Sequence, residues 1–324
     1  MKVARLLGAM VIVAFGTSPL GGVAAEPYPT KVVTIINPFA AGGSLDILLR
    51  LVADRMSETL GHSVVVENRP GAGSMIGTAA VARARPDGYT VLATATNIVS
   101  APALGAPVHY DWKKDFAPVT LLGTIAQFVA VPEDSPAKTL QEFVALAKAK
   151  PGTYSIGSLG PGSSGNVNGK RLEQVAQIQL VDIPYKGMSE TMTALAGGQI
   201  QVAYGNVPDV LMYQRGGRVR PIAIAMPMRS ELAPNIPTMA ESGFPSGAIP
   251  PWYGVLVPAG TSPDIVAKLQ QSFAAAMKHP PIAARLKEMA ITPIASTPDE
   301  FRQYLDADYA MYSKLGKEMG ISLK

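Results

Sequence analysis

Short strands rich in β-branched residues alternate with helices along most of this chain, and that order constrains the fold more than any other feature. A strand is expected over 32–36, followed by a turn with two glycines and a helix over 45–59 whose apolar residues recur at helical spacing. Further strands are expected at 64–67 and 89–93. A repeated strand–turn–helix order predicts an α/β fold with a mostly parallel, doubly wound sheet.

A second unit with the same order begins near Ala126. Its strands are expected at 128–131, 155–158, 180–183, 201–204 and 221–225. Thr139 and Glu142 form a capping box at the start of one of its helices. The last third of the chain adds a strand over 253–257 and helices that begin after Ser262 and Thr297. A chain of about 300 residues exceeds one ordinary core, so we expect two domains with a cleft between them.

The first 25 residues have the pattern of an export signal. Lys2 and Arg5 precede an apolar run over 6–15, and small residues at 23–25 come before a cleavage site at Glu26. The run is shorter than the roughly 20 residues that span a bilayer. The alternative is a buried N-terminal helix. The chain has no cysteine, so an exported form relies on its core rather than on disulfides. We therefore predict a soluble periplasmic protein.

Composition argues against several other classes. The chain has 28 Lys+Arg and 24 Asp+Glu, a net charge of +4, and the basic residues are scattered. A balance this weak does not favour nucleic acid as a partner. With three histidines far apart and no cysteine, no metal site and no cofactor is predicted. No G-x-S-x-G motif is present, and no histidine pairs with an evident nucleophile, so no catalytic residue is predicted.

The turn after the first strand is the first candidate binding site. Its small residues let a ligand approach the backbone, and the following helix offers unpaired N–H groups to an anion. It lacks the lysine of a phosphate-binding loop. The alternative is a plain turn capped by Ser44 or Asp46, and Asp46 is expected to face the backbone as a cap. The candidate ligand-binding residues here are Phe39, Ala40, Ala41, Gly42, Gly43 and Ser44.

A second glycine-rich turn over 157–166 also joins a strand to a helix. It offers backbone and hydroxyl donors without charge, which bind a carboxylate through geometry. The alternative is a flexible linker. Its candidate residues are Ser158, Gly160, Pro161, Gly162 and Ser163, and other turns add Ala72, Thr96, Tyr185, Lys186, Gly187 and Asn206. Lys186 is the one cation near the presumed cleft, with a solvated side chain as its alternative.

Taken together, these turns resemble the substrate-binding receptors of tripartite tricarboxylate transporters, the Bug or TctC-like periplasmic binding proteins. The resemblance runs from Tyr28 to the end of the chain. It is carried by residues 38–44 with Asp46, by 66–73, 86–90, 157–163 and 184–187, and by Gly197-Gly198-Gln199, Arg229-Ser230, Pro237-Thr238 and 241–243.

The resemblance implies a type II periplasmic-binding-protein architecture with two doubly wound lobes and an inter-lobe cleft. Lobe 1 would comprise 26–125 and 246–324, and lobe 2 would comprise 126–245. It implies a ligand carboxylate held by backbone amides and small hydroxyls of the two glycine turns, and permease subunits of the inner membrane as partners. The chain departs from the family pattern at Asn37, Asn166 and Lys170.

Three hypotheses follow. The first is a monomeric receptor that captures a small organic anion, a mono- or dicarboxylate that can be aromatic, for transport or for sensing. The second is an exported hydrolase on the same scaffold, which would need a base and a nucleophile in the cleft. The third is a binding module of an ABC-type uptake system, against which the turn motifs argue.

Overall fold

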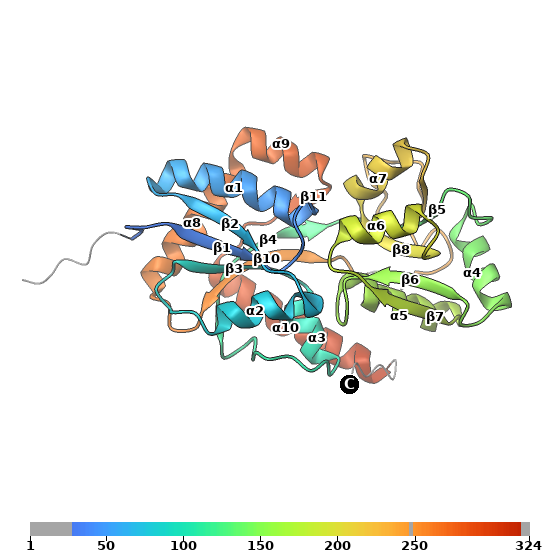
Figure 1. Cartoon of the computed structure of the whole chain (residues 1–324), viewed down its shortest axis with the longest axis horizontal. Helices are drawn as coiled ribbons and strands as arrows, with labels where there is room; N and C mark the ends of the chain where they lie inside the picture. The colour runs from blue at the N-terminus through green and yellow to red at the C-terminus, as the bar shows by residue number, and fades with distance from the viewer. Residues whose placement is uncertain (1–27, 246–248, 319–324) are drawn as a thin grey trace, which may run out of the picture.

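The computed structural model describes residues 28–245 and 249–318 and contains two β-sheets, one in each half of the molecule (Figure 1). The six-stranded sheet has the order β11-β4-β10-β3-β1-β2. Its strands are β1 (Val33–Asn37), β2 (Val64–Asn68), β3 (Thr90–Ala95), β4 (Phe116–Ile125), β10 (Trp252–Pro258) and β11 (Ile291–Pro293). We call this sheet with its helices lobe 1.

The five-stranded sheet, with its helices, is called lobe 2. Its order is β7-β6-β8-β5-β9. The strands are β5 (Gln127–Pro132), β6 (Tyr154–Ser158), β7 (Leu180–Pro184), β8 (Val202–Asn206) and β9 (Val219–Ile224). The chain enters lobe 2 at Ala126, between β4 and β5, and returns to lobe 1 between β9 and β10. The predicted export signal over 1–25 lies outside the described residues.

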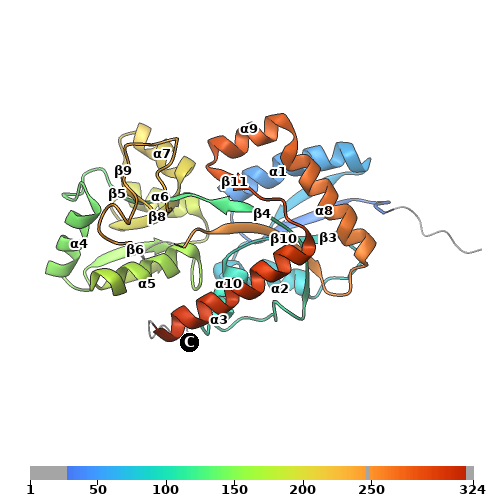
Figure 2. The same cartoon turned by 180° about the vertical axis from the view of Figure 1, so that it is seen from behind.

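Helices cover both faces of each sheet. In lobe 1 one face carries α1 (Ser44–Leu60), α8 (Pro263–Lys278) and α9 (Pro280–Glu288), and the other carries α2 (Met75–Ala82), α3 (Asn97–Ala103) and α10 (Pro298–Glu318) (Figure 2). In lobe 2 the faces carry α4 (Leu140–Ala149) with α5 (Ser164–Ala176), and α6 (Met188–Ala196) with α7 (Val207–Arg215). A single 3₁₀ turn, η1 (Ala72–Ser74), precedes α2.

Burial on both sheet faces explains the runs of apolar residues in the strands. In β1, Val33 and Ile35 pack into the core beneath α1 and α8, whereas Ile36 packs into the core beneath α10. Phe128 and Val129 of β5 likewise enter different cores. Successive strand residues point to opposite faces, so a sheet covered on both sides needs apolar residues at every position. The predicted class, α/β with two doubly wound lobes, is confirmed.

The prediction of mostly parallel sheets is wrong. Among the pairings between named strands, β1 with β2 and β3, and β6 with β7 and β8, are parallel, but the other five are antiparallel. All five involve β4, β5 or β10, the strands by which the chain crosses between the lobes or arrives after crossing. Sequence reasoning also missed β4 entirely, although it is the longest strand described.

Local capping follows the sequence closely. Gly61 ends α1 in the left-handed region with φ 69°, a conformation that glycine adopts without strain. Thr297 and Glu300 exchange reciprocal bonds to each other's N–H groups, at 2.8 and 3.3 Å. At Thr139 the hydroxyl accepts from Glu142 N as predicted, but the Glu142 carboxylate accepts from Lys138 N instead of Thr139 N. Of the helices described, none is long and apolar enough to cross a membrane.

Gly254 of β10 provides a test of the lobe 1 core. A Cβ atom at this position would lie 2.3 Å from Cζ of the buried Phe301 on α10. Gly254→Ala is expected to lower the free energy of unfolding by about 1–3 kcal/mol because the ring has no free space to move into. Urea unfolding measures it. Gly216→Ala is the control, since its nearest contact would be 3.5 Å. An unchanged midpoint for Gly254→Ala would contradict this packing.

Asp308 of α10 makes the stability of lobe 1 depend on pH. Burial raises the pKa of its carboxyl to about 6, although the Trp252 indole N–H, which donates to it at 2.8 Å, acts in the opposite direction. The protonated form is favoured by folding, so this contribution is complete below about pH 4 and is lost as the pH rises through about 6. Relative to Asp308→Asn, the wild type should lose about 2 kcal/mol between pH 4.5 and 7.5 in urea unfolding. Parallel curves for both proteins would contradict the assignment.

Candidate functional site

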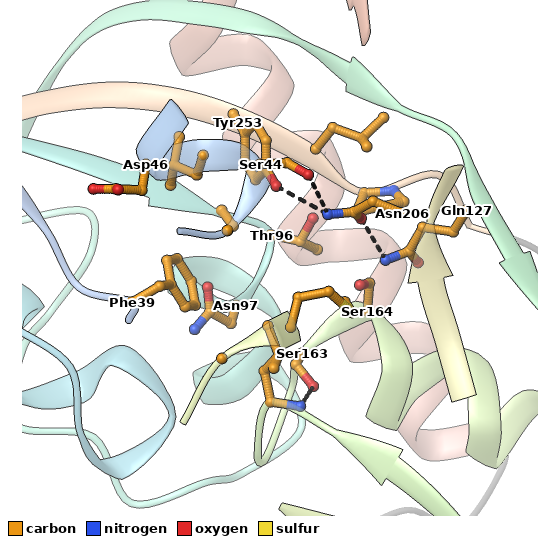
Figure 3. Close-up of a pocket in the computed structure, with 18 of the residues that line it drawn as sticks. Phe39, Ser44, Asp46, Thr96, Asn97, Gln127, Ser163, Ser164, Asn206 and Tyr253 are labelled. Carbon is orange, nitrogen blue, oxygen red and sulfur yellow. Dashed lines mark hydrogen bonds between the residues drawn. The ribbon is translucent and has the colours of Figure 1, made fainter. Parts of the chain in front are cut away.

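A cavity lies between the two lobes, where the N-terminal ends of helices from both sheets meet (Figure 3). Lobe 1 contributes the turn before α1, the end of β3 and part of β10, and lobe 2 contributes the turns before α5, α6 and α7. The lining residues are Phe39, Ala40, Gly43, Ser44, Leu45, Asp46, Ala95, Thr96, Asn97, Ile125, Gln127, Leu159, Ser163, Ser164, Gly187, Met188, Asn206, Pro251 and Tyr253.

The N-termini of four helices line this cavity. The N-cap residues of α1, α5, α6 and α7 are Gly43, Ser163, Gly187 and Asn206, and each of them contributes to the wall. The first N–H groups of a helix have no partner within it, and the helix dipole adds a partial positive charge there. The cavity therefore presents donors from both lobes to one enclosed space, which suits an anion.

The lining carries a carboxylate but no cation. Among the described residues that form the cavity, Asp46 is the single charged one. Its carboxylate accepts from Gly42 N at 3.0 Å and from Asn68 at 2.9 Å, and it pairs with Arg50 at 3.0 Å. Burial raises the pKa of Asp46, but the bonds from Arg50, Gly42 and Asn68 outweigh burial and hold the pKa below its ordinary value. Asp46 thus accepts a backbone N–H, as expected, and is neutralised locally, but it is not the predicted cap, because the N-cap of α1 is Gly43 and no side chain bonds there as a cap.

A chain of hydrogen bonds links the lobes beside the cavity. Gln127 Nε2 donates to Asn206 Oδ1 at 3.2 Å, and Asn206 Nδ2 donates to Ser44 Oγ at 3.2 Å and to Tyr253 Oη at 3.5 Å. Ser44 Oγ donates to Asp209 Oδ2 at 3.1 Å. Ser44 and Tyr253 belong to lobe 1, and the other three belong to lobe 2. Burial raises the pKa of Asp209 to about 6, against the lowering effect of the bonds with Ser44 and Asn206.

Eight of the predicted site residues line the cavity: Phe39, Ala40, Gly43, Ser44, Thr96, Ser163, Gly187 and Asn206. Five others line an adjoining hollow that shares Phe39 and Leu159 with the cavity: Ala72, Gly160, Pro161, Tyr185 and Lys186. Ala41, Gly42, Ser158 and Gly162 line neither. The side chain of Lys186 is exposed, and its backbone N–H donates to Glu190.

The residues outside the cavity have structural partners. Ser158 Oγ donates to Asp182, and the N–H of Gly42 is occupied by Asp46. The N–H of Gly162 donates to Asn166 Oδ1 at 3.1 Å, so it is not a free donor for a ligand. A Cβ on Gly162 would lie 2.5 Å from the backbone of Ala101 in lobe 1. Glycine at this position is therefore required by the contact between the lobes.

The positions that depart from the family pattern also have local partners. Asn166 satisfies Gly162 as described, Asn37 Oδ1 accepts from Phe39 N at 3.3 Å, and Lys170 pairs with Glu173 at 2.7 Å. None of the three lines the cavity. Asn37 and Asn166 thus order the backbone of the two turns whose residues form the wall.

The predicted set lacks several lining residues, of which Asn97, Gln127, Ser164 and Tyr253 are polar and uncharged. Gln127 begins β5 directly after the crossing at Ala126, and Tyr253 lies near the start of β10 on the return. Both positions are where the chain passes between lobes, which is a signal that could have found them. Among the described residues, no group of three or more His, Cys, Asp or Glu could hold a metal ion.

Two doubly wound lobes that enclose a cavity lined by helix N-termini define a solute-binding receptor of the periplasmic-binding fold. The sequence profile of the Tripartite tricarboxylate transporter family receptor matches residues 48–321. The chain therefore belongs to this receptor family, as the sequence resemblance predicted. Its members are receptors rather than enzymes, which also confirms the expectation that the chain is not an enzyme and rules out the hydrolase hypothesis.

Individual relatives are similar over almost the whole length. Protein BugT of Bordetella pertussis is 31% identical over 326 residues, covering 100% of both chains. A Rhodopseudomonas palustris protein solved with adipate is 29% identical with a TM-score of 0.87, covering 91% of this chain and 99% of the other. The R. palustris protein MatC with bound malate is 28% identical with a TM-score of 0.85, covering 89% and 100%.

Gly43 gives the cleanest test of the cavity as the ligand site. A Cβ there would meet only Ala40 O, at 3.9 Å, and the backbone φ of −77° suits any residue. Gly43→Ala should weaken carboxylate binding, and Gly43→Val should abolish it, because the added methyl groups occupy the space beside the α1 donors. Calorimetric titration measures affinity, and the melting temperature checks folding. A folded Gly43→Val protein with wild-type affinity would place the ligand elsewhere. Gly162→Val is unsuitable because it would also disturb the lobe contact.

Proposed function

We propose that this receptor captures a small carboxylate, a mono- or dicarboxylate whose body can be aromatic, in the cavity between the lobes. The observation that carries the proposal is the set of four helix N-termini at one cavity whose described lining contains no lysine or arginine. Backbone N–H groups that a helix leaves unpaired bind a carboxylate through charge-assisted hydrogen bonds. The adipate and malate carried by two solved relatives support this ligand class.

The ligand contacts are proposed to come from the eight predicted residues that line the cavity. In this arrangement Gly43, Ser44, Ser163 and Gly187 hold the carboxylate, and the ring of Phe39 packs against the apolar body of the ligand. Phe39 lies at the wall shared with the adjoining hollow. That hollow gives room to a longer or aromatic ligand, whose far end would approach Tyr185.

The two lobes are proposed to close around the ligand. The segments 26–125 and 246–324 would form one lobe and 126–245 the other, in accordance with the two sheets and the crossing at Ala126. Bonds between Ser44 and Asp209, and between Asn206 and Tyr253, already join the lobes at the cavity wall. Closure would remove water from the cavity and so strengthen every hydrogen bond to the carboxylate.

The cellular role is proposed from the family. We expect export through the signal over 1–25, action in the periplasm as a monomer, and delivery of the ligand to permease subunits of the inner membrane or to a sensing pathway. Family membership supports the transport partner. Co-purification of the liganded receptor with its cognate permease would test the transport role, and a receptor that acts only in sensing would give no complex.

A screen of carboxylates tests the binding function itself. The mature chain is mixed with acetate, succinate, malate, adipate or benzoate, and the melting temperature is compared with that of a chloride control. A ligand at 100 times its Kd stabilises the folded state by about 2.7 kcal/mol, which gives a shift of several degrees. Calorimetry then measures the affinity of each ligand that shifts the transition. If no carboxylate binds, the proposed function is wrong.

Lys186 distinguishes neutral capture from a salt bridge. Its side chain is exposed and lies at the adjoining hollow, not at the cavity. Solvent screens an exposed charge, so Lys186→Ala should change the affinity for a monocarboxylate by less than about threefold. Calorimetry at low and high salt measures this, with Lys138→Ala on the surface of lobe 2 as the control. A loss of a hundredfold or more would mean that a cation, rather than helix N-termini, holds the ligand.

A further inference from the structure

Asn97, a residue of the cavity wall, has a buried acceptor oxygen without a donor. Its Nδ2 donates to Gly73 O at 2.7 Å and also to Ser74 Oγ. A carbonyl oxygen can only accept, so the bond to Gly73 fixes which end of the amide faces η1. Asn97 Oδ1 is consequently the other end, and no described group donates to it. The side chain lines the cavity and is 3% exposed, so this oxygen cannot rely on bulk solvent.

Gln127 has a second acceptor oxygen of this kind. The orientation of its amide is fixed by hydrogen bonds that run from Asp209 through Ser44 and Asn206. An ionised Asp209 can only accept, so the single hydrogen of Ser44 Oγ is directed to Asp209. Ser44 must then accept from Asn206 Nδ2, which directs Asn206 Oδ1 to Gln127 Nε2. Gln127 Oε1 is what remains. It is buried, and no described group donates to it.

The two residues line one cavity from opposite sides, Asn97 on the side of Phe39 and Gln127 on the side of Asn206 (Figure 3). A buried acceptor without a donor costs about 1–3 kcal/mol. One such atom is an ordinary imperfection, but this cavity has two. Asn97 is oriented directly by the Gly73 carbonyl, and Gln127 is oriented by Asp209 through Ser44 and Asn206. A ligand that satisfies them must donate hydrogen bonds as well as carry a carboxylate.

The charge of the cavity decides which donor fits. An ammonium group would need a carboxylate partner once it is removed from water. Asp46 is already engaged by Arg50 and by Gly42 N, and Asp209 lies behind Ser44. Neutral amide oxygens match a neutral donor. A second ionised carboxylate has no hydrogen to donate, so it would face the same oxygens unfavourably.

We propose that Asn97 and Gln127 make this receptor selective for hydroxycarboxylates over carboxylates of the same skeleton that lack the hydroxyl. The inference rests on the proposed function, because it assumes that the carboxylate is held by the helix N-termini of the same cavity. The two amides act as specificity determinants for the second functional group, and the relay through Ser44 and Asn206 positions Gln127.

Matched ligand pairs test this selectivity near pH 7.5, where Asp209 is ionised. The pairs are malate and succinate, 3-hydroxybutyrate and butyrate, 2-hydroxyglutarate and glutarate, and 4-hydroxybenzoate and benzoate, with aspartate as the ammonium counterpart of malate. Calorimetry gives each Kd for the full mature chain. In the pair that binds most tightly, the hydroxylated member should bind about tenfold tighter, as expected for one satisfied buried acceptor.

Two variants assign the selectivity to these residues. Gln127→Met preserves the side-chain length but removes Oε1, and Asn97→Ala removes Oδ1. At least one of them should reduce the ratio between the hydroxylated and plain ligands by fivefold or more, with the hydroxylated ligand losing more affinity. Gln174→Met, at an exposed position of α5, is the matched control and should leave the ratio unchanged. Circular dichroism and melting temperature confirm folding, and having two variants at separate sites allows for one that fails to fold.

Each outcome has a defined meaning. If plain and hydroxylated ligands bind equally, or if aspartate binds more tightly than malate, the selectivity proposal is overturned while the carboxylate receptor stands. If the wild-type ratio is large but both folded variants retain it, the assignment to Asn97 and Gln127 is overturned. If no carboxylate in any pair binds, the proposed function fails, and the selectivity proposal fails with it.

Discussion

The unpaired N–H groups at the start of α1, α5 and α6 are the constraint on which the rest of the structure depends. A helix cannot satisfy its first donors internally, so an enclosed space at several helix starts requires an acceptor from elsewhere. The doubly wound topology places these starts at the carboxyl ends of parallel strands, where α/β folds bind their ligands. Two lobes facing each other bring two such edges together. The binding site is therefore a consequence of chain topology before any specialised side chain is considered.

The hydrogen bonds between the lobes are made by the same segments that line the cavity. Ser44 is the first residue of α1, and its hydroxyl is directed to Asp209 in the first turn of α7. Asn206, the N-cap of α7, contacts Ser44 and Tyr253. The same short segments thus line the cavity and join the lobes. A ligand that engaged Ser44 and Asn206 would contact the groups that join the lobes in this structure, so the proposed capture and the proposed closure would share the same atoms.

Local features of the fold followed from the sequence, whereas its long-range features did not. The end of α1 at Gly61 and the capping box of Thr297 and Glu300 depend on residues a few positions apart, and the structure has both. The direction of β10 depends on where the chain returns from the other lobe, and no local pattern records that. This is why the predicted parallel sheets were found to be mixed. The missed strand β4 is buried along almost its whole length, so it lacks an alternating polar pattern.

The cavity shows the same division. Gly43, Ser163 and Asn206 could be found because a glycine, serine or asparagine at the start of a helix is itself a recognisable signal. Gln127 and Tyr253 lie in strands, where only their position next to the crossings between the lobes distinguishes them from structural polar residues. Gly162 shows the converse case. Its place in a glycine-rich turn suggested that a ligand approaches the backbone closely, but the group that approaches closely is Ala101 of the other lobe.

The neutral character of the cavity explains how one scaffold can serve many ligands. An arginine clamp would bind any carboxylate strongly, and its charge would dominate every difference between ligands. Helix N-termini supply a weaker attraction that is common to all carboxylates. Under the proposed selectivity, the remaining discrimination would depend on neutral groups such as Asn97 and Gln127, because the gain or loss of one hydrogen bond is comparable to the differences among ligands. Replacing one of these two amides would then change the preferred ligand without altering the carboxylate contacts or the fold.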